Sequence, residues 1–482
     1  MNTQHYIAGR WQPAQDERCF EVRNPADDSL VARVSEGGGA DARLAVDAAA
    51  LALPAWKARP PRERCLILKK WQALIERDVE PLAQLISREQ GKPLAEARGE
   101  IAYSAGYVEW FAEEGVRANG EVIAAPVTSK RFIVLKEAVG VVAVVTPWNF
   151  PAAMIARKIA PALAAGCTVL AKPAEDTPLT ALALVKLAEE AGVPPGVLNI
   201  VSASRERTPQ VVGEWLADPR VRKISFTGST PVGKLLARDS AATLKKLSLE
   251  LGGNAPFIVF EDADLDAAVE GLMAAKFRNG GQTCVSPNRV YVHAAVHDRF
   301  VDKLAARVGA LKVGPADWPA AEIGPMINAR AVDKIERHVN DAVAKGAKVV
   351  VGGRRVRNET AHGPNYYAPT VLINATRAME LSCEETFGPV VPVFRFANEA
   401  EVMEQANDTP YGLAAYVQSG DLERARKVAS QLRVGNVHIN YPAWDTAAPF
   451  GGYKQSGNGR EYAEFGLEEF LEIKGVIGYE AA

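Results

Sequence analysis

Cysteine is scarce in this sequence, and its pattern excludes a disulfide-stapled protein. The 482 residues contain five cysteines, an odd number scattered from Cys19 to Cys383. Small secreted domains carry closely spaced, paired cysteines, whereas free and dispersed ones are typical of a reducing compartment. The N-terminus has no apolar run with a cleavage site, so no export signal is expected. Both observations predict a cytoplasmic protein.

Charge of one sign and long apolar runs are also lacking. The chain has 56 Lys and Arg against 58 Asp and Glu, a net charge of −2, so no basic excess exists to hold a nucleic acid. The most apolar stretch, residues 138–145, ends at Thr146-Pro147, and the following one is broken by Arg157-Lys158. Neither is long enough to cross a bilayer. We therefore expect neither a nucleic-acid partner nor a membrane span.

Three common metal and dinucleotide motifs are absent: HExxH, CxxC and GxGxxG. With six dispersed histidines as well, no metal site is expected. Residues 228–234 do read GxxxxGK, the phosphate loop of nucleoside triphosphatases, but the magnesium-binding Ser or Thr that should follow is Leu235. By itself this is equally an ordinary strand-to-helix turn. A glycine-rich turn that opens a helix nevertheless favours an anion, so we expect phosphate binding without ATP hydrolysis.

Strands and helices alternate from about residue 139 onward. The strand-like segments GVVAVVT, CTVLAKP, VLNIVS and RKISFTG are separated by helical segments, and the pattern resumes after residue 250. Such alternation predicts parallel strands joined by right-handed crossovers, in two α/β domains. The first hundred residues are helix-rich. Segment 131–139 alternates in hydropathy and predicts a strand pair that leaves the main body.

Several short segments, taken together in their order and spacing, resemble the NAD(P)-dependent aldehyde dehydrogenase superfamily from end to end. They are TPWNFP (146–151), FTGST (226–230), LELGGN (249–254), GGQTC (280–284), EETFGPV (384–390) and PFGGYKQSGNGRE (449–461). The resemblance is closest to the succinate-semialdehyde dehydrogenase branch, through EWFAEEG (109–115), AMIARKIAPALAAGCT (153–168) and KFRNGGQTC (276–284).

This resemblance implies an α/β fold of the aldehyde dehydrogenase kind, with a Rossmann-type cofactor domain, an α/β catalytic domain and a small β arm for oligomerisation. It places the NAD-binding domain at residues 1–117 and 139–249 and the catalytic domain at 250–452. The arm and C-terminal tail comprise 118–138 and 453–482. An exposed strand pair with apolar alternation seeks a partner edge, which agrees with a homodimer or homotetramer.

The resemblance also implies three catalytic residues. Cys284 matches the family nucleophile, whose thiolate adds to the aldehyde carbon; it needs either a lowered pKa or a nearby base. Asn149 matches the oxyanion donor, together with the backbone N–H of Cys284. Glu250 matches the general base that activates water, and burial at the end of an apolar strand raises such a pKa. Each residue has an ordinary alternative without the resemblance. Cys284 would be a small buried residue, Asn149 a turn asparagine and Glu250 a solvent-facing carboxylate.

The matching cofactor residues predict a dinucleotide. Lys172 and Glu175 match the segment that binds the adenosine ribose, and a carboxylate at Glu175 repels a 2′-phosphate, so NAD is preferred and NADP is possible. The full set is Trp148, Lys172, Glu175, Gly228, Ser229, Gly233, Leu251, Glu385 and Phe387.

The substrate of the resembled branch carries a carboxylate held by two arginines, which Arg157 and Arg278 match. Arginine suits that task because its planar fork pairs bidentately with a carboxylate; the alternative for each is a structural salt bridge. The loop 440–448 departs from the close relatives, with Trp444 and Asp445 where they have a serine. Asp445 is expected to repel a carboxylate or to tie up one arginine. Tyr441 adds aromatic surface there, and a second cysteine near the nucleophile is replaced by Ser286.

The sequence therefore predicts an NAD(P)-dependent dehydrogenase that oxidises a small aldehyde, such as succinate semialdehyde, to its acid. One alternative is an enzyme for glutarate semialdehyde or for an uncharged or aromatic aldehyde. A second is a catalytically silent family member with a structural role, which the intact Cys284, Asn149 and Glu250 disfavour. A phosphate-loop ATPase is remote because of Leu235.

Overall fold

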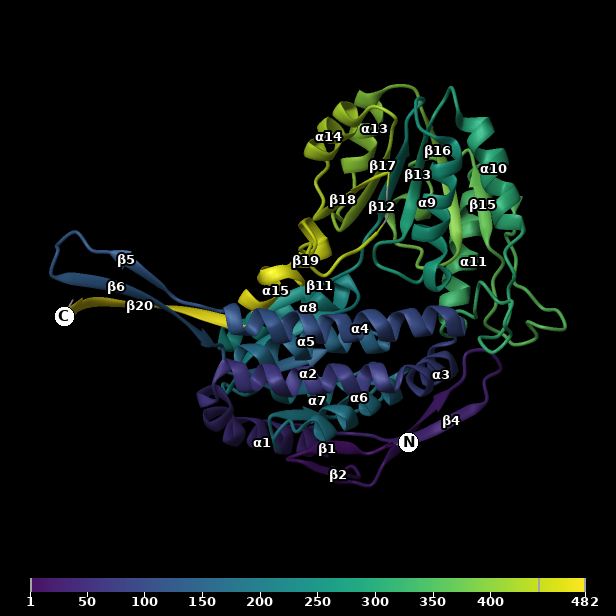
Figure 1. Cartoon of the computed structure of the whole chain (residues 1–482). Helices are drawn as coiled ribbons and strands as arrows, with labels where there is room; N and C mark the ends of the chain where they lie inside the picture. Colours follow the sequence, from purple (N-terminus) through teal and green to yellow (C-terminus); the bar gives the residue numbers. More distant parts are fainter. Residues whose placement is uncertain (1, 441–442, 481–482) are drawn as a thin grey trace.

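The computed structural model describes residues 2–440 and 443–480, which build two large mostly parallel sheets and a projecting three-stranded arm (Figure 1). The first sheet has the order β19-β11-β10-β7-β8-β9-β1-β2. Its central strands are parallel, as the alternation predicted. They are β7 (Val141–Val145), β8 (Thr168–Lys172), β9 (Leu198–Ile200), β10 (Val221–Thr227) and β11 (Lys246–Glu250). The edge strands β1 (His5–Ile7), β2 (Arg10–Gln12) and β19 (Gly457–Asn458) are antiparallel.

Helices cover both faces of this sheet because its strands are apolar on both sides. Along β7, Val142 and Val144 face one core while Val141 and Val145 face the other, as the two-residue period of a strand requires. The first core is built with α2 (Pro61–Arg77), α3 (Val79–Gln90), α4 (Leu94–Glu114), α5 (Pro151–Ala165) and α6 (Pro178–Ala191). The second contains α1 (Gly39–Ala58), α7 (Thr208–Ala217) and α8 (Thr230–Ser240).

The second sheet has the order β14-β15-β16-β13-β12-β17-β18, and only β14 runs antiparallel to its neighbour. Its strands are β12 (Ala255–Val259), β13 (Pro287–His293), β14 (Lys348–Val351), β15 (Thr370–Ile373), β16 (Val390–Phe396), β17 (Ala414–Gln418) and β18 (Asn436–Ile439). One face packs against α9 (Leu265–Phe277) and α10 (His297–Gly309). The other packs against α11 (Ala329–Ala344), α13 (Glu399–Asn407) and α14 (Leu422–Gln431), and the short helices α12 (Glu380–Cys383) and α15 (Ala463–Glu468) complete the molecule.

The arm consists of β5 (Glu121–Ala124), β6 (Lys130–Ala138) and β20 (Leu471–Glu480), in the antiparallel order β20-β6-β5. Figure 1 shows it extending away from the two sheets, with the C-terminus at its far end. The expectation that 131–139 forms a strand pair is wrong. This segment belongs to one strand, β6, which pairs with β5 and with β20 of the C-terminal tail. A further two-stranded unit, β3 (Cys19–Arg23) and β4 (Leu30–Ser35), lies near the N-terminus.

The domain boundaries given above remain a prediction. Residues 457–458, which that prediction assigned to the arm and tail, form an edge strand of the first sheet beside β11. None of the described helices has the length and apolar character needed to cross a lipid bilayer.

Candidate active site

The carboxyl ends of the parallel strands meet at a cavity of about 800 Å³. In open α/β sheets this edge is the usual place for a ligand, because the loops there leave a crevice between strands and helices. The cavity is lined from the first sheet by the residues that follow β7, β10 and β11, and from the second by the turn of the predicted nucleophile and by α11. The predicted residues on its wall are Trp148, Asn149, Arg157, Glu175, Gly228, Ser229, Leu251, Arg278, Cys284, Glu385, Phe387, Trp444 and Asp445.

Cys284, the predicted nucleophile, follows a turn that only glycine-rich sequence can make. Three consecutive residues, Asn279, Gly280 and Gly281, have φ values of 52°, 62° and 75°, in the left-handed region. A Cβ atom on Gly281 would lie 2.3 Å from the carbonyl oxygen of Gly388. The glycine pair before the thiol is therefore required both by backbone conformation and by the close approach of a second loop.

Burial raises the pKa of the Cys284 thiol to about 12, an effect that the nearby Arg157 guanidinium offsets only in part. The thiol was predicted to have either a lowered pKa or a nearby base. Its pKa is raised, so it needs the base. Glu250 is close enough for its charge to act on the thiol. Within residues 2–440 and 443–480 the backbone N–H of Cys284 has no hydrogen-bond acceptor, so this donor is available to a ligand.

Asn149 follows β7 and is held by hydrogen bonds with Lys92 and with the turn before Cys284. Its backbone carbonyl accepts hydrogen bonds from Lys92 Nζ and from Asn279 Nδ2, both at 2.9 Å. Its side-chain Nδ2 donates to the carbonyl oxygen of Gln282 at 3.0 Å, which leaves one amide hydrogen for a ligand. Lys92 in turn forms a fully buried ion pair with Glu100 at 2.5 Å.

Glu100 connects that ion pair to the helix that follows Asn149. Its Oε1 accepts from the backbone N–H groups of Ala152 and Ala153, at 2.9 and 3.3 Å, in the first turn of α5. A carboxylate at a helix N-terminus satisfies orphan donors and interacts favourably with the helix dipole. Lys92 and Glu100 thus fix the position of the Asn149 loop against α5.

Glu250 ends β11, with 2 % of its surface exposed and both carboxylate oxygens without a hydrogen-bond partner among the described residues. Burial raises the pKa of this carboxyl well above its usual range, and the nearby Glu461 carboxylate raises it further. The two glycines that follow make room for the site. A Cβ on Gly252 would lie 2.9 Å from Glu385 Oε2, and one on Gly253 would lie 2.3 Å from the carbonyl oxygen of Cys284.

Arg157 is buried in α5 and is already paired. Its Nε lies 2.7 Å from Glu461 Oε2, and its Nη1 donates to the Tyr462 hydroxyl at 3.1 Å. Lys158 approaches the other oxygen of Glu461 at 2.5 Å. The charge of Arg157 is thus largely offset within the protein, although its Nη2 has no hydrogen-bond partner among the described residues.

Arg278 differs from Arg157 because no described residue forms an ion pair or hydrogen bond with it. Its guanidinium lies over two aromatic rings, 4.9 Å from the centre of Phe150 and 5.2 Å from that of Tyr103. Rings hold a cation by their quadrupole without occupying its N–H donors. The five donors of Arg278 remain available at the cavity wall.

The loop after β18 lines the cavity with Trp444, which contacts the rings of His438 and Phe450 at 4.3 and 5.3 Å. Asp445 is exposed, and its Oδ1 accepts from the backbone N–H of Ala447 at 2.8 Å. Asp445 forms no ion pair with an arginine in the part of the chain that is described, so the expectation that it ties one up is wrong. Tyr441 lies outside the described residues.

The opposite end of the cavity carries the predicted dinucleotide residues. Glu175 Oε2 lies 3.3 Å from Lys172 Nζ, which is buried behind it and does not line the cavity itself. Ser229 is the N-cap of α8 but makes no side-chain cap, so the first N–H groups of that helix have no side-chain acceptor. This uncapped end, with Gly228 beside it, suits a pyrophosphate.

The predicted nicotinamide end carries two rings and a carboxyl group. Trp148 and Phe387 meet edge to face at 5.6 Å. Glu385 Oε1 accepts from the backbone N–H of Gly253 at 3.0 Å, and burial raises the pKa of its carboxyl to about 7. Gly233 does not line the cavity: a Cβ there would meet the side chain of Leu251 at 2.4 Å, so this glycine serves the packing of α8.

Other wall residues were missed from the sequence. Phe150 and Phe450 lie inside quoted motifs but had no role assigned, and the others come from outside those motifs and meet only in the folded chain. The aromatic ones pack in one cluster with the thiol, and charged ones also line the wall. They are Tyr103, Tyr107, Phe150, Phe450 and Tyr462, and Asp176, Arg205, Arg330 and Lys334.

Comparisons with known proteins cover nearly the whole chain. The sequence model of the aldehyde dehydrogenase family matches residues 11–476. A glutarate-semialdehyde dehydrogenase of Pseudomonas aeruginosa is 50% identical over 98% of this chain and 96% of its own length. The NADP(+) succinate-semialdehyde dehydrogenase GabD of Escherichia coli is 51% identical over 98% of this chain and 96% of its own. The crystal structure of succinate-semialdehyde dehydrogenase from Burkholderia pseudomallei superposes with a TM-score of 0.96, at 51% identity over 98% of this chain and 97% of that one.

Proposed function

This chain belongs to the aldehyde dehydrogenase family, and on that premise we propose that it oxidises a small semialdehyde that bears a carboxylate, such as succinate semialdehyde, with NAD(P) as acceptor. Family membership makes it an oxidoreductase that acts on aldehydes, and it confirms the resemblance and the fold class inferred from the sequence. Relatives named for succinate and glutarate semialdehydes support the substrate class.

The observation that carries the substrate proposal is the guanidinium of Arg278. Arg278 is partly buried, and no described residue forms a hydrogen bond or an ion pair with it. The Glu96 carboxylate acts on it only through its charge, so the guanidinium donors lack an acceptor, which is costly. A substrate carboxylate on the cavity side satisfies several of its donors at once. Arg157 contributes less charge because Glu461 already pairs with it, and its free Nη2 offers one further donor.

The first chemical step is the addition of the Cys284 sulfur to the aldehyde carbon. The thiol proton must leave first, because burial favours the neutral thiol. The carboxylates of Glu385, Glu250 and Glu461 all act on the thiol by charge, and Glu250 is the proposed base because both of its oxygens are without a described partner. The aldehyde oxygen becomes an oxyanion, which accepts from the backbone N–H of Cys284 and from the free amide hydrogen of Asn149. Each such donor is worth about 3 kcal/mol in the transition state.

Bound NAD(P) supplies the hydride acceptor that turns this thiohemiacetal into a thioester. Glu385 and Phe387 are placed to hold its nicotinamide end, and the uncapped N-terminus of α8 its pyrophosphate. Glu250 then takes a proton from the water that hydrolyses the thioester. Because the pKa of Glu250 is raised, its basic form becomes more abundant as the pH rises.

A substrate panel tests this function. We expect reduced-nicotinamide formation with succinate and glutarate semialdehydes to exceed that with propanal and benzaldehyde. Arg278→Gln should lower kcat/KM for the acid semialdehydes by about tenfold or more, since charged hydrogen bonds are worth about 1.5–3 kcal/mol. The kcat/KM of the same variant for propanal should change by less than about twofold, because propanal has no carboxylate. Arg307→Gln is the matched control, since Arg307 is paired with Glu270 on the surface of the protein.

Other outcomes of the panel select the alternatives. An equal loss for propanal and for the semialdehydes would contradict a carboxylate site at Arg278. A preference for glutarate semialdehyde, or for benzaldehyde, would favour the dehydrogenases for those substrates, with Trp444 shaping the pocket. No turnover by the unaltered protein, with behaviour unchanged in Cys284→Ala, would favour a catalytically silent family member.

For the cofactor, we propose a preference for NAD, with NADP accepted. The support is the Glu175 carboxylate, which lines the adenosine end and repels a 2′-phosphate. The Escherichia coli relative is named for NADP(+), so the two cofactors must be compared directly. Glu175→Ser should move the ratio of kcat/KM toward NADP by about tenfold, and Glu464→Ser, which removes an exposed carboxylate on α15, should not. An unchanged ratio in Glu175→Ser would contradict the proposal.

We also propose that the protein works in the cytoplasm as a homodimer or homotetramer. The support for the compartment is its odd number of scattered cysteines, none of them in a disulfide. The support for assembly is the arm, which is described further below.

A further inference from the structure

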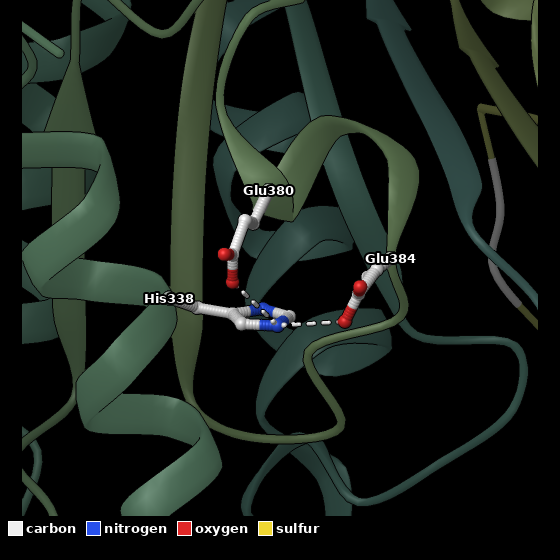
Figure 2. Close-up of side chains that lie close together, drawn as sticks. All are labelled: His338, Glu380 and Glu384. Carbon is white, nitrogen blue, oxygen red and sulfur yellow. Dashed lines mark hydrogen bonds and ion pairs between the residues drawn. The ribbon is translucent and has the colours of Figure 1, made fainter.

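A buried histidine lies behind the part of the cavity wall that carries Glu385 and Phe387. His338, on α11, has no exposed surface. One of its ring nitrogens, Nδ1, lies 3.1 Å from the hydroxyl oxygen of Thr386, and the other, Nε2, lies 3.3 Å from Glu384 Oε2. Figure 2 shows the imidazole ring with the Glu384 carboxylate beside it and the Glu380 carboxylate above it, both approaching Nε2.

This cluster has the residue types of a metal site, but its cation is already present. The ligand-type atoms of His338, Glu380 and Glu384 lie within 4.8 Å of one another. The guanidinium of Arg337 lies 3.3 Å from each of the two carboxylates and from His338 Nε2. An arginine in that position neutralises the acids as a metal ion would. We therefore interpret the cluster as an ion-pair network that ties α11 to segment 380–387.

The same face of α11 holds that segment at both ends. Lys334 Nζ donates to the carbonyl oxygen of Glu385 at 2.5 Å, and Asp341 Oδ2 accepts from the backbone N–H of Glu380 at 2.7 Å. Side chains three, four and seven residues apart lie on one face of a helix, so Lys334, Arg337, His338 and Asp341 act together. His338 is the central member and the one that reaches the residue between Glu385 and Phe387.

The segment needs such support because its backbone is strained. Phe387 has a φ of 58°, which a residue with a bulky side chain adopts only when its surroundings impose it. The next residue, Gly388, is wedged between Ile335 of α11 and Gly281: a Cβ on Gly388 would lie 2.4 Å from Ile335, and one on Gly281 would lie 2.3 Å from the Gly388 carbonyl oxygen. The segment therefore connects α11 to the turn of the nucleophile.

We propose that His338 is a positioning residue for dinucleotide binding, which holds Thr386 and Glu384 so that Glu385 and Phe387 face the cavity. This inference rests on the proposed function, because it requires a dinucleotide at that wall. His338 does not touch the cavity and acts only through Thr386 and Glu384. Burial and the adjacent Lys334 lower the pKa of its imidazole, so the neutral ring makes these contacts at neutral pH.

The test is a fluorescence titration with NADH, and with NADPH, in the absence of aldehyde. His338→Leu removes both polar contacts, and Thr386→Val removes one of them at nearly constant volume. Each should raise the Kd of NADH about fivefold, the effect of one lost hydrogen bond. The double variant should bind no more weakly than the weaker single one, because both changes remove the same contact. His338→Asn keeps a polar atom at the place of Nδ1 and should return the Kd to within about twofold of the unaltered protein.

A matched control is available on α10. His297 is also buried, and its Nδ1 lies 2.7 Å from Asp298 and 2.9 Å from Arg395, so it too contacts a carboxylate and an arginine, but away from the cavity. His297→Leu should leave the Kd unchanged. In steady-state kinetics the loss in His338→Leu should fall on the KM of the dinucleotide rather than on that of the aldehyde.

Three results would overturn the proposal. The first is an unchanged Kd in His338→Leu, even with a lower melting temperature, since that would make the residue merely structural. The second is an equal rise in His297→Leu. The third is an unchanged Kd in Thr386→Val, which is the decisive variant if His338→Leu does not fold. If the unaltered protein binds neither NADH nor NADPH, the proposed function itself fails, a result that is distinct because it involves no substitution.

Discussion

At the scale of single residues, the proposed role of Glu250 in chemistry opposes its contribution to stability. Its carboxyl group is buried at the end of β11 with neither oxygen bonded to a described residue. A base for water needs an unengaged oxygen near the reacting carbon, and a buried polar group without a partner destabilises the fold. The raised pKa of Glu250 expresses the same conflict.

Replacement of this carboxyl should therefore stabilise the protein in a pH-dependent way. The folded state binds the Glu250 proton more tightly than the unfolded chain, so the stability that this gives is present below the ordinary pKa of glutamate and is lost as the pH rises above it. The melting temperature of Glu250→Gln should be close to that of the unaltered protein at about pH 4.5 and should exceed it increasingly toward pH 9. Aldehyde oxidation should fall by about 10²–10⁴.

The measurement is a set of thermal unfolding curves across that pH range, with kcat for each protein. Leu249→Val changes a buried apolar neighbour on β11, and it should show a difference that does not vary with pH. A constant difference between Glu250→Gln and the unaltered protein would mean that the Glu250 pKa is not raised by folding.

At the scale of elements, the connection between β11 and β12 joins the two sheets and touches both halves of the site. Gly253 donates its backbone N–H to Glu385 at 3.0 Å, while its Cα faces the carbonyl oxygen of Cys284. The two glycines in LELGGN are thus explained by contacts with segments more than thirty residues away along the chain. The sequence indicated a close approach here but not its partners.

Gly253→Ala should displace the nucleophile without unfolding the protein. The added Cβ would lie 2.3 Å from the Cys284 carbonyl oxygen, so one of the two loops must move. Since displacements of about 1 Å cost on the order of 10²-fold in a positioned reaction, we expect kcat/KM to fall by that order. The comparison is Gly213→Ala in α7, where no atom lies within 4 Å and alanine should add about 0.5–1 kcal/mol of stability. Similar kcat/KM values for the two variants would disprove the steric account.

At the scale of the whole molecule, the arm exposes apolar side chains that a monomer has no reason to keep. Ile473 and Ile477 on β20 are 75% and 79% exposed, and Val122 on β5 is 71% exposed. An apolar three-stranded sheet that projects from the body is a surface for a second copy of the chain. This agrees with the homo-oligomer proposed above.

Charges on the arm should therefore reduce the size of the assembly. We expect the double substitution Ile473→Glu and Ile477→Glu to lower the molar mass measured by size-exclusion chromatography with light scattering. Leu51→Glu, at an equally exposed apolar site on α1, should not change it. A monomeric unaltered protein, or an unchanged mass in the double variant, would exclude the arm as the interface.

Local sequence patterns determined a large part of this protein. The two-residue and helical periods specify β7 to β11 and the helices between them, because each element depends on residues adjacent in the chain. The run Asn279, Gly280 and Gly281 encodes the turn of the nucleophile, since only such residues adopt three left-handed conformations in succession. The structure contains these strands, helices and this turn, with small shifts of their boundaries.

Only the tertiary structure decided how charges are paired, because pairing depends on which distant segments the two sheets bring together. Arg157 and Arg278 are equivalent in the sequence, yet Glu461 forms an ion pair with the first, while the second lies over two rings and forms no ion pair with a described residue. Asp445 was expected to repel a carboxylate or to tie up an arginine; it pairs with no described arginine and accepts from the backbone N–H of Ala447 instead. The pKa of Cys284 also depends on the folded structure, because burial of the thiol raises it more than the nearby Arg157 guanidinium lowers it.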